Sequence, residues 1–205
     1  MRYTVVSYAS QLAYLAPQFV VPVIVLTNVS PSQNANFFIA WTFTMLMWVL
    51  PFTISRVLLT ESGHDDVSLV DETRRAVLFA VGLATAALLA GLAARPLILW
   101  MFGPLYEDTL HYLPLLLAGG VPAAVTTVLL GFARARDDTP ASVAIPLVLA
   151  VTTVGIALAT VPDHGADGAT WAWFIGNSAA ALVAVALVVP RRTAGRILRR
   201  LPRTT

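Results

Sequence analysis

The chain has 205 residues, of which 58% are hydrophobic and 12% are charged, and its formal net charge is +2. A soluble domain carries about 25% charged residues, so this sequence lacks the polar shell that a water-soluble core of its size needs. The small net charge gives no basis for nucleic-acid binding, and the absence of cysteine excludes disulfides and thiolate metal sites. Lipid is therefore the expected solvent for most of the chain.

The first part of the chain predicts two membrane spans. Residues 3–55 carry no charged side chain, and one span needs only about 20 residues. A cluster of turn-forming residues over 28–34 divides the stretch, so the spans are expected over about 12–27 and 37–59. No small-residue cleavage site follows the start of the chain, so the first span is interpreted as retained, not as a signal peptide.

Four further spans are predicted after a charged segment. Residues 61–75 carry seven charged side chains and predict a hydrated loop with room for a short helix. The apolar runs that follow cover about 76–94, 110–133, 141–161 and 170–189. A shorter apolar piece, residues 97–102, cannot cross a bilayer and is expected at the membrane interface, where Trp100 is typical. The predicted fold is an all-α polytopic transmembrane helix bundle of about six spans.

The distribution of arginine predicts the orientation of this bundle. With the N-terminus inside, twelve of the thirteen cationic residues fall in inner segments, and only Arg95 falls in an outer one. The twelve are Arg2, Arg56, Arg74, Arg75, Arg134, Arg136, Arg191, Arg192, Arg196, Arg199, Arg200 and Arg203. This is the positive-inside pattern, which predicts a protein of the cytoplasmic (inner) membrane with both termini cytoplasmic. Residues 1–190 would form the transmembrane lobe, and residues 191–205 a basic cytoplasmic tail attracted to anionic lipid.

Prolines within or near the spans bear on packing. Each removes a backbone N–H and can kink its helix, and in lipid the carbonyl that is freed needs another partner. We therefore expect these helices to face other helices or a wet cavity. The prolines are Pro17, Pro22, Pro51, Pro114, Pro122 and Pro146.

The sequence offers no constellation typical of an enzyme. The three histidines lack metal-ligand spacing, no glycine-rich loop matches a phosphate-binding motif, and the acidic pairs flank spans, where solvated loop charge is the ordinary interpretation. We therefore predict a non-enzyme with no catalytic residues, no metal site and no cofactor. No charged residue lies near the middle of a span, although proton-coupled transporters usually carry an intramembrane carboxylate.

Three residues are candidates for binding a substrate. Arg56 lies near the cytoplasmic end of the second span, where it either attracts an anionic group from the cytoplasm or anchors the helix end by snorkelling. Gln18 in the first span and Asn177 in the last are candidates for lining a polar cavity. The alternative for both is an ordinary hydrogen bond between helices, worth about 0.6 kcal/mol in membranes.

Several short elements resemble the polysaccharide (lipid-linked oligosaccharide) flippases of the multidrug/oligosaccharidyl-lipid/polysaccharide exporter superfamily. Two elements carry most of the likeness: Phe102-Gly103-x-x-Tyr106 and, about 60 residues later, Gly165-x-x-Gly168-Ala169. The order of the other elements agrees with the C-terminal half of those proteins. They are 15–17 with Pro22, 35–40, 50–55, 60–62 and 97–106.

The resemblance implies one lobe of a two-lobed exporter that translocates lipid-linked oligosaccharide or polysaccharide precursors by alternating access. Related branches export drugs by cation antiport, which this chain fits less well because its spans lack a carboxylate. The family's first lobe is missing here. A homodimer or a separately encoded first lobe could replace it, because an even number of spans places both termini on one side. The remaining alternative is a truncated half-transporter or a membrane scaffold without transport of its own.

Overall fold

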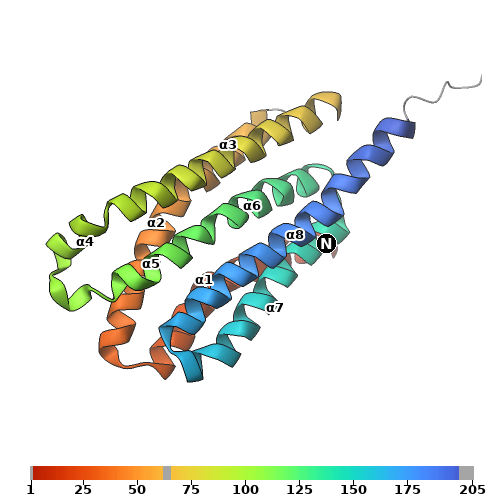
Figure 1. Ribbon diagram of the computed structural model, residues 1–205. Coiled ribbons are helices and arrows are strands. Elements are labelled where there is room, and N and C mark those ends of the chain that lie inside the picture. The colour runs from red at the N-terminus through yellow and green to blue at the C-terminus, as the bar shows by residue number, and fades with distance from the viewer. Residues whose placement is uncertain (1, 62–65, 199–205) are drawn as a thin grey trace, which may run out of the picture.

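The computed structural model describes the chain over residues 2–61 and 66–198, and the surroundings of side chains over residues 8–49 and 73–189. All regular structure in these ranges is helical (Figure 1). The helices are α1 (Arg2–Asn28), α2 (Pro31–Glu61), α3 (Asp66–Ala93), α4 (Arg95–Phe102), the 3-10 turn η1 (Pro104–Tyr106), α5 (Thr109–Ala118), α6 (Gly120–Ala135), α7 (Thr139–His164) and α8 (Ala166–Leu198).

Five stretches of helix with described side chains are long and apolar enough to cross a membrane. They are Tyr8–Asn28, Thr73–Ala93, Thr109–Ala135, Thr139–His164 and Ala166–Val189. The sixth long helix, α2, runs for 31 residues, but residues 50–61 lie outside the residues whose side chains are described. The prediction of an all-α polytopic bundle is confirmed.

The long helices run back and forth between two ends of the bundle. One end, which we call the Asn36 end, gathers the α1–α2 turn, the α4–η1–α5 segment and the α7–α8 turn (Figure 1). The other, the Arg134 end, gathers the start of α1 and the α6–α7 turn. α7 packs against both α1 and α8, whereas α2 and α3 pack against the α5–α6 pair. α6 also packs on α8 and so joins the two groups.

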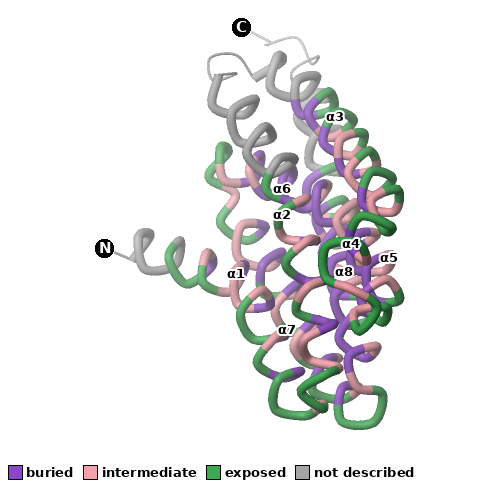
Figure 2. Tube along the Cα trace, turned by 90° about the vertical axis from the view of Figure 1, so that its left-hand side faces the viewer, coloured by how far each residue is buried: buried purple, intermediate pink, exposed green. Residues whose placement is uncertain are grey.

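Buried residues follow the inner faces of the helices (Figure 2). An aromatic chain crosses this core from Tyr14 through Trp48, Trp173, Trp41 and Phe37 to Tyr112, with successive ring centroids 4.9–6.4 Å apart. Edge-to-face and offset contacts at such distances contribute about 0.5–1.5 kcal/mol each beyond burial. Three long helices, α1, α2 and α8, and the short helix α5 meet in this chain of rings.

The span predicted over 110–133 is broken at Gly119, where α5 ends and α6 begins. Pro122 has no N–H to donate to the carbonyl of Ala118, so the regular hydrogen-bond pattern is interrupted there. Gly119 also lies under the indole of Trp173, because a Cβ at this position would be 2.7 Å from the Trp173 ring. The break thus follows from one proline and one close ring contact.

Two helices extend beyond the predicted spans. α3 begins at Asp66, so much of the predicted loop over 61–75 is helical; charged residues can occupy helical turns that project out of the lipid. α8 continues to Leu198, which makes the first part of the predicted tail helical, and residues 199–205 lie outside the described residues.

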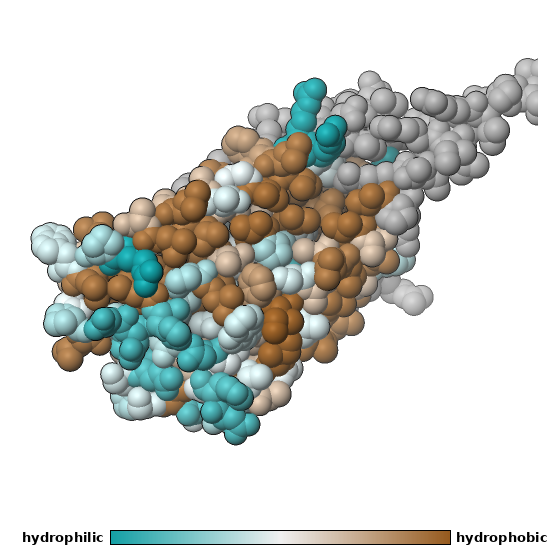
Figure 3. All heavy atoms as spheres, in the orientation of Figure 1, coloured by the Kyte–Doolittle hydropathy of each residue, from teal (hydrophilic) through white to brown (hydrophobic). Residues whose placement is uncertain are grey.

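The surface separates into an apolar flank and polar ends. Hydrophilic residues gather at the Asn36 end, at the lower left of Figure 3, and a smaller group lies near the start of α3. Of the arginines with described side chains, only Arg95 belongs to the Asn36 end, whereas Arg134 and Arg136 lie at the other. This is the arrangement of a bundle whose middle contacts lipid. Which end faces the cytoplasm stays a prediction.

Candidate functional site

Polar side chains follow one face of α1. Ser10, Tyr14 and Gln18 are spaced by four residues, and this spacing places them in a row along a helix. Ser10 Oγ donates to the carbonyl of Ser142 in α7 at 2.6 Å. Thr127 Oγ1 donates to the Ala123 carbonyl, so it accepts from Tyr14 Oη, 2.8 Å away. We call Ser10, Tyr14 and Gln18 the polar row of α1.

Gln18 is the member of the polar row whose side chain has no hydrogen bond to any described residue. Its side chain is half-buried, at the middle of the apolar helix. Pro22, four residues later, also has no N–H to donate to the Gln18 carbonyl. The amide and the carbonyl of one residue are thus available together at membrane depth, where an unpaired polar group is costly.

Asn177 and Arg56 do not join Gln18 in a described site. Asn177 is only 1% exposed, and its Nδ2 donates to the carbonyl of Trp173 in its own helix at 2.8 Å. This bond lies within α8 and not between helices, so the substrate role and the inter-helix hydrogen bond considered for Asn177 both stay predictions. Arg56 belongs to α2, but its side chain lies outside the described residues.

Sequence reasoning missed the donors that serve the carbonyls freed by proline. Pro146 cannot donate to the Ser142 carbonyl, and Ser10 supplies the hydrogen bond instead. In the same way Pro114 leaves the Leu110 carbonyl free, and Arg95 Nη2 donates to it at 3.3 Å. The expectation that freed carbonyls find partners on other helices is confirmed at these two positions. In the sequence, the residue four positions before each proline identifies the carbonyl that needs a donor.

The Ser10 bond leads to a test by double substitution. We expect Ser10→Ala to lower the free energy of unfolding by about 0.6–1.7 kcal/mol, the range of hydrogen bonds between membrane helices. Pro146→Ala restores an N–H for the Ser142 carbonyl, so Ser10→Ala should cost less in that background. Thermal stability in detergent, measured for both single variants and the double variant, checks this. Strict additivity of the two substitutions would contradict the pairing.

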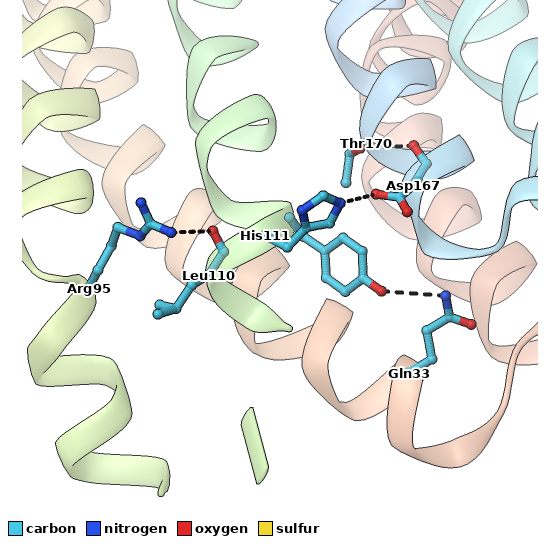
Figure 4. A network of polar contacts seen from close by, with 7 residues as sticks. Gln33, Arg95, Leu110, His111, Asp167 and Thr170 are labelled. Atoms are coloured by element: carbon cyan, nitrogen blue, oxygen red, sulfur yellow. Dashed lines mark hydrogen bonds and ion pairs between the residues drawn. The ribbon is translucent and has the colours of Figure 1, made fainter. Parts of the chain in front are cut away.

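A second polar cluster lies at the Asn36 end of the bundle (Figure 4). His111 Nε2 and Asp167 Oδ1 are 2.9 Å apart and join α5 to α8. Gln33 Nε2 donates to Tyr112 Oη at 3.4 Å, which joins α2 to α5. Thr109 bonds through its backbone N–H to Asn36 Oδ1 at 3.0 Å. These side chains are engaged with one another, so the cluster ties the turns together.

No metal centre emerges from this cluster. Over the described part of the chain, no group of three or more His, Cys, Asp or Glu side chains could hold an ion.

The two elements that carry the family resemblance form turns at this end. Gly103 (φ 85°) ends α4, and Gly165 (φ 60°) ends α7, and such left-handed backbone favours glycine. The Phe102 ring contacts Phe43 of α2 and Tyr106, at centroid distances of 6.3 and 5.8 Å. Both elements therefore have structural roles that explain their residue types.

The fold and the polar row define the class of the protein: a multi-pass α-helical membrane bundle with a polar face on one proline-containing helix. No protein-family model matches the sequence, and no curated protein matches it.

Among solved structures the chain is similar to the outward-facing conformation of a multidrug resistance MATE family transporter of the MOP superfamily. The TM-score is 0.76 at 20% sequence identity, over 92% of this chain and 44% of that one. The likeness establishes the fold, and the chain spans less than half of the length of that transporter.

Proposed function

We propose that the chain is one lobe of a membrane transporter that works by alternating access against a second lobe. The observation that carries the proposal is Gln18, which presents an amide and a proline-freed carbonyl in the middle of a span. Such groups occur in lipid where they face a wet cavity or a partner. The similarity in fold to a transporter supports the same interpretation.

The second lobe of the proposed assembly is a second copy of this chain, a separately encoded protein, or the other half of a longer protein of which this chain is a part. The matched transporter is more than twice as long as the part that this chain covers, so an equivalent assembly needs a second lobe. The predicted orientation places both termini in the cytoplasm. Two copies would then insert with the same orientation in the membrane, and a twofold axis along the membrane normal would relate them.

We assign lipid-linked oligosaccharide or polysaccharide precursors as the substrate. The order of the flippase-like elements supports this class, as does the lack of a charged residue near the middle of any predicted span. A drug/cation antiporter fits the fold equally, since the solved neighbour is a multidrug resistance transporter. In the proposed site, Gln18 contacts the sugar and Arg56 attracts the phosphate, while Asn177 packs α8.

Reconstitution tests the transport proposal. Proteoliposomes that contain the chain, alone and with any first-lobe partner, should move a fluorescent lipid-linked oligosaccharide between leaflets faster than empty liposomes. Arg56→Ala should lower the rate by about tenfold, the loss of about 1.4 kcal/mol from a charge-assisted contact. Arg75→Ala is the matched control, because Arg75 is an exposed arginine near the start of α3.

The results separate the candidate functions. Transfer that depends on a cation gradient and accepts drugs would support the antiporter. No transfer above empty liposomes in either preparation would support the membrane scaffold, which has no transport of its own. Equal rates for Arg56→Ala and Arg75→Ala would remove Arg56 from the site while leaving the transporter in place.

A further inference from the structure

α4 and η1 present large apolar side chains away from the bundle at the Asn36 end. Trp100 and Leu105 are 82% and 85% exposed, and Leu97 and Met101 are exposed as well. Leu97, Trp100 and Met101 are spaced by three and four residues, which places them on one helical face. We call these four residues the α4 patch.

The opposite side of α4 is fixed to the bundle. Ile98 is buried, and the Phe102 ring packs on Phe43 of α2 and on Tyr106 of η1. Arg95, at the start of α4, donates to the Leu110 carbonyl of α5. Because these contacts hold both ends of the helix, the α4 patch keeps its outward orientation.

Water is an unfavourable solvent for this patch. Each exposed apolar Å² costs about 25 cal/mol relative to an apolar environment, and contiguous exposed apolar surface usually marks an interaction site. The patch also follows α3, whose side chains Leu78, Phe79 and Leu89 are exposed along the apolar flank. The surface that meets lipid thus continues directly into α4.

The hydrocarbon core is equally unfavourable. The backbone from Gly103 to Asp108 interrupts the α-helical structure with a single 3-10 turn, in which Tyr106 N to Gly103 O is 3.2 Å and Glu107 N to Pro104 O is 3.3 Å. Arg95, Glu107 and Asp108 are exposed beside the patch. Irregular backbone and charges that face lipid are not tolerated in the hydrocarbon region.

We propose that α4 and η1 form an anchor that lies in the headgroup region of the bilayer at the Asn36 end, with the α4 patch inserted among the lipids. Only the headgroup region both keeps the apolar patch out of water and keeps the charges and the turn backbone out of hydrocarbon. Tryptophan is enriched there. The anchor joins α3 to α5, so it fixes the depth of the ends of both helices. This placement does not depend on the transport proposal or on which end faces the cytoplasm.

Spin labelling measures the depth of the anchor directly. The chain has no cysteine, so single cysteines at Trp100 and, independently, at Leu105 can carry a nitroxide in proteoliposomes. Val151, exposed in the middle of α7, serves as the hydrocarbon reference, and Asp163, exposed at the end of α7, as the aqueous reference. Accessibility to oxygen and to a water-soluble nickel chelate gives the depth of each label.

Labels at positions 100 and 105 should lie about 5–10 Å inside the headgroup boundary, as interfacial apolar faces do, between the two references. Values equal to those at Asp163 would place the patch in water, and values equal to those at Val151 would place it in hydrocarbon. Labels shielded from both reagents would mean that a second lobe or a second copy covers the patch. Any of these three results overturns the proposal.

Discussion

Replacing Trp173 with alanine is expected to lower the free energy of unfolding by about 3 kcal/mol, at the low end of the range for buried tryptophan. The indole is 1% exposed and meets Trp41 and Trp48 at ring distances of 4.9 and 5.9 Å. The low end applies because apolar surface in a bilayer is covered by lipid even when helices separate, so the cost comes mainly from lost packing.

Thermal stability in detergent measures this loss. A change of 1 kcal/mol corresponds to about 2–4 °C in Tm for a protein of this size. Trp171→Ala is the matched control, because Trp171 lies two residues away in α8 and is 52% exposed. Its substitution should change stability by no more than about 0.5 kcal/mol. Equal effects at the two positions would contradict the assignment of Trp173 to the core.

Trp173→Phe separates packing from hydrogen bonding. Within the described residues, the buried Nε1 of Trp173 has no hydrogen-bond acceptor, and removing an unsatisfied donor recovers part of its desolvation cost of about 1–3 kcal/mol. We therefore expect Trp173→Phe to cost well under half as much as Trp173→Ala. Losses of equal size would show that the N–H is bonded in another conformation of the protein.

The sequence predicted the helical bundle because the bilayer sets a length that each apolar run must reach. The turn over 28–34 and the separate short piece over 97–102 were predictable for the same reason, because neither polar clusters nor short apolar runs can cross a bilayer. The interfacial position of the short piece stays a prediction. The partners of each helix could not be predicted. In a membrane protein, the helix faces that meet other helices and the faces that meet lipid are both apolar. No local sequence pattern therefore predicts that α7 packs on both α1 and α8.

The candidate site shows the same limit. A proline identifies the carbonyl that loses its donor, four residues earlier, and this applies at Ser142 and Leu110. The donor that replaces it comes from the tertiary fold: Ser10 is 132 residues from Ser142, and Arg95 is 15 from Leu110. Asn177 was a candidate on polarity alone, and its bond to the Trp173 carbonyl within α8 has no signature that distinguishes it from a cavity-lining amide.

The Gly165-x-x-Gly168-Ala169 element makes α7 and α8 approach closely. A Cβ at Gly168 would be 2.7 Å from the carbonyl carbon and 2.8 Å from the carbonyl oxygen of Thr160. Thr160 Oγ1 also donates to the Gly168 carbonyl at 3.1 Å, and Ala169 is fully buried. Because the obstacle is backbone, a rotamer change cannot relieve it.

Gly168→Ala should therefore lower the free energy of unfolding by about 1–3 kcal/mol, the usual cost of overpacking, measured as a fall in Tm in detergent. Gly155→Ala, also in the α7–α8 pair, meets nothing within 4 Å and should raise stability by up to about 1 kcal/mol through helix propensity. A Gly168→Ala protein that keeps its Tm but loses transport would contradict the packing role. The glycine would then serve movement between the lobes, and the resemblance carried by this element would be functional.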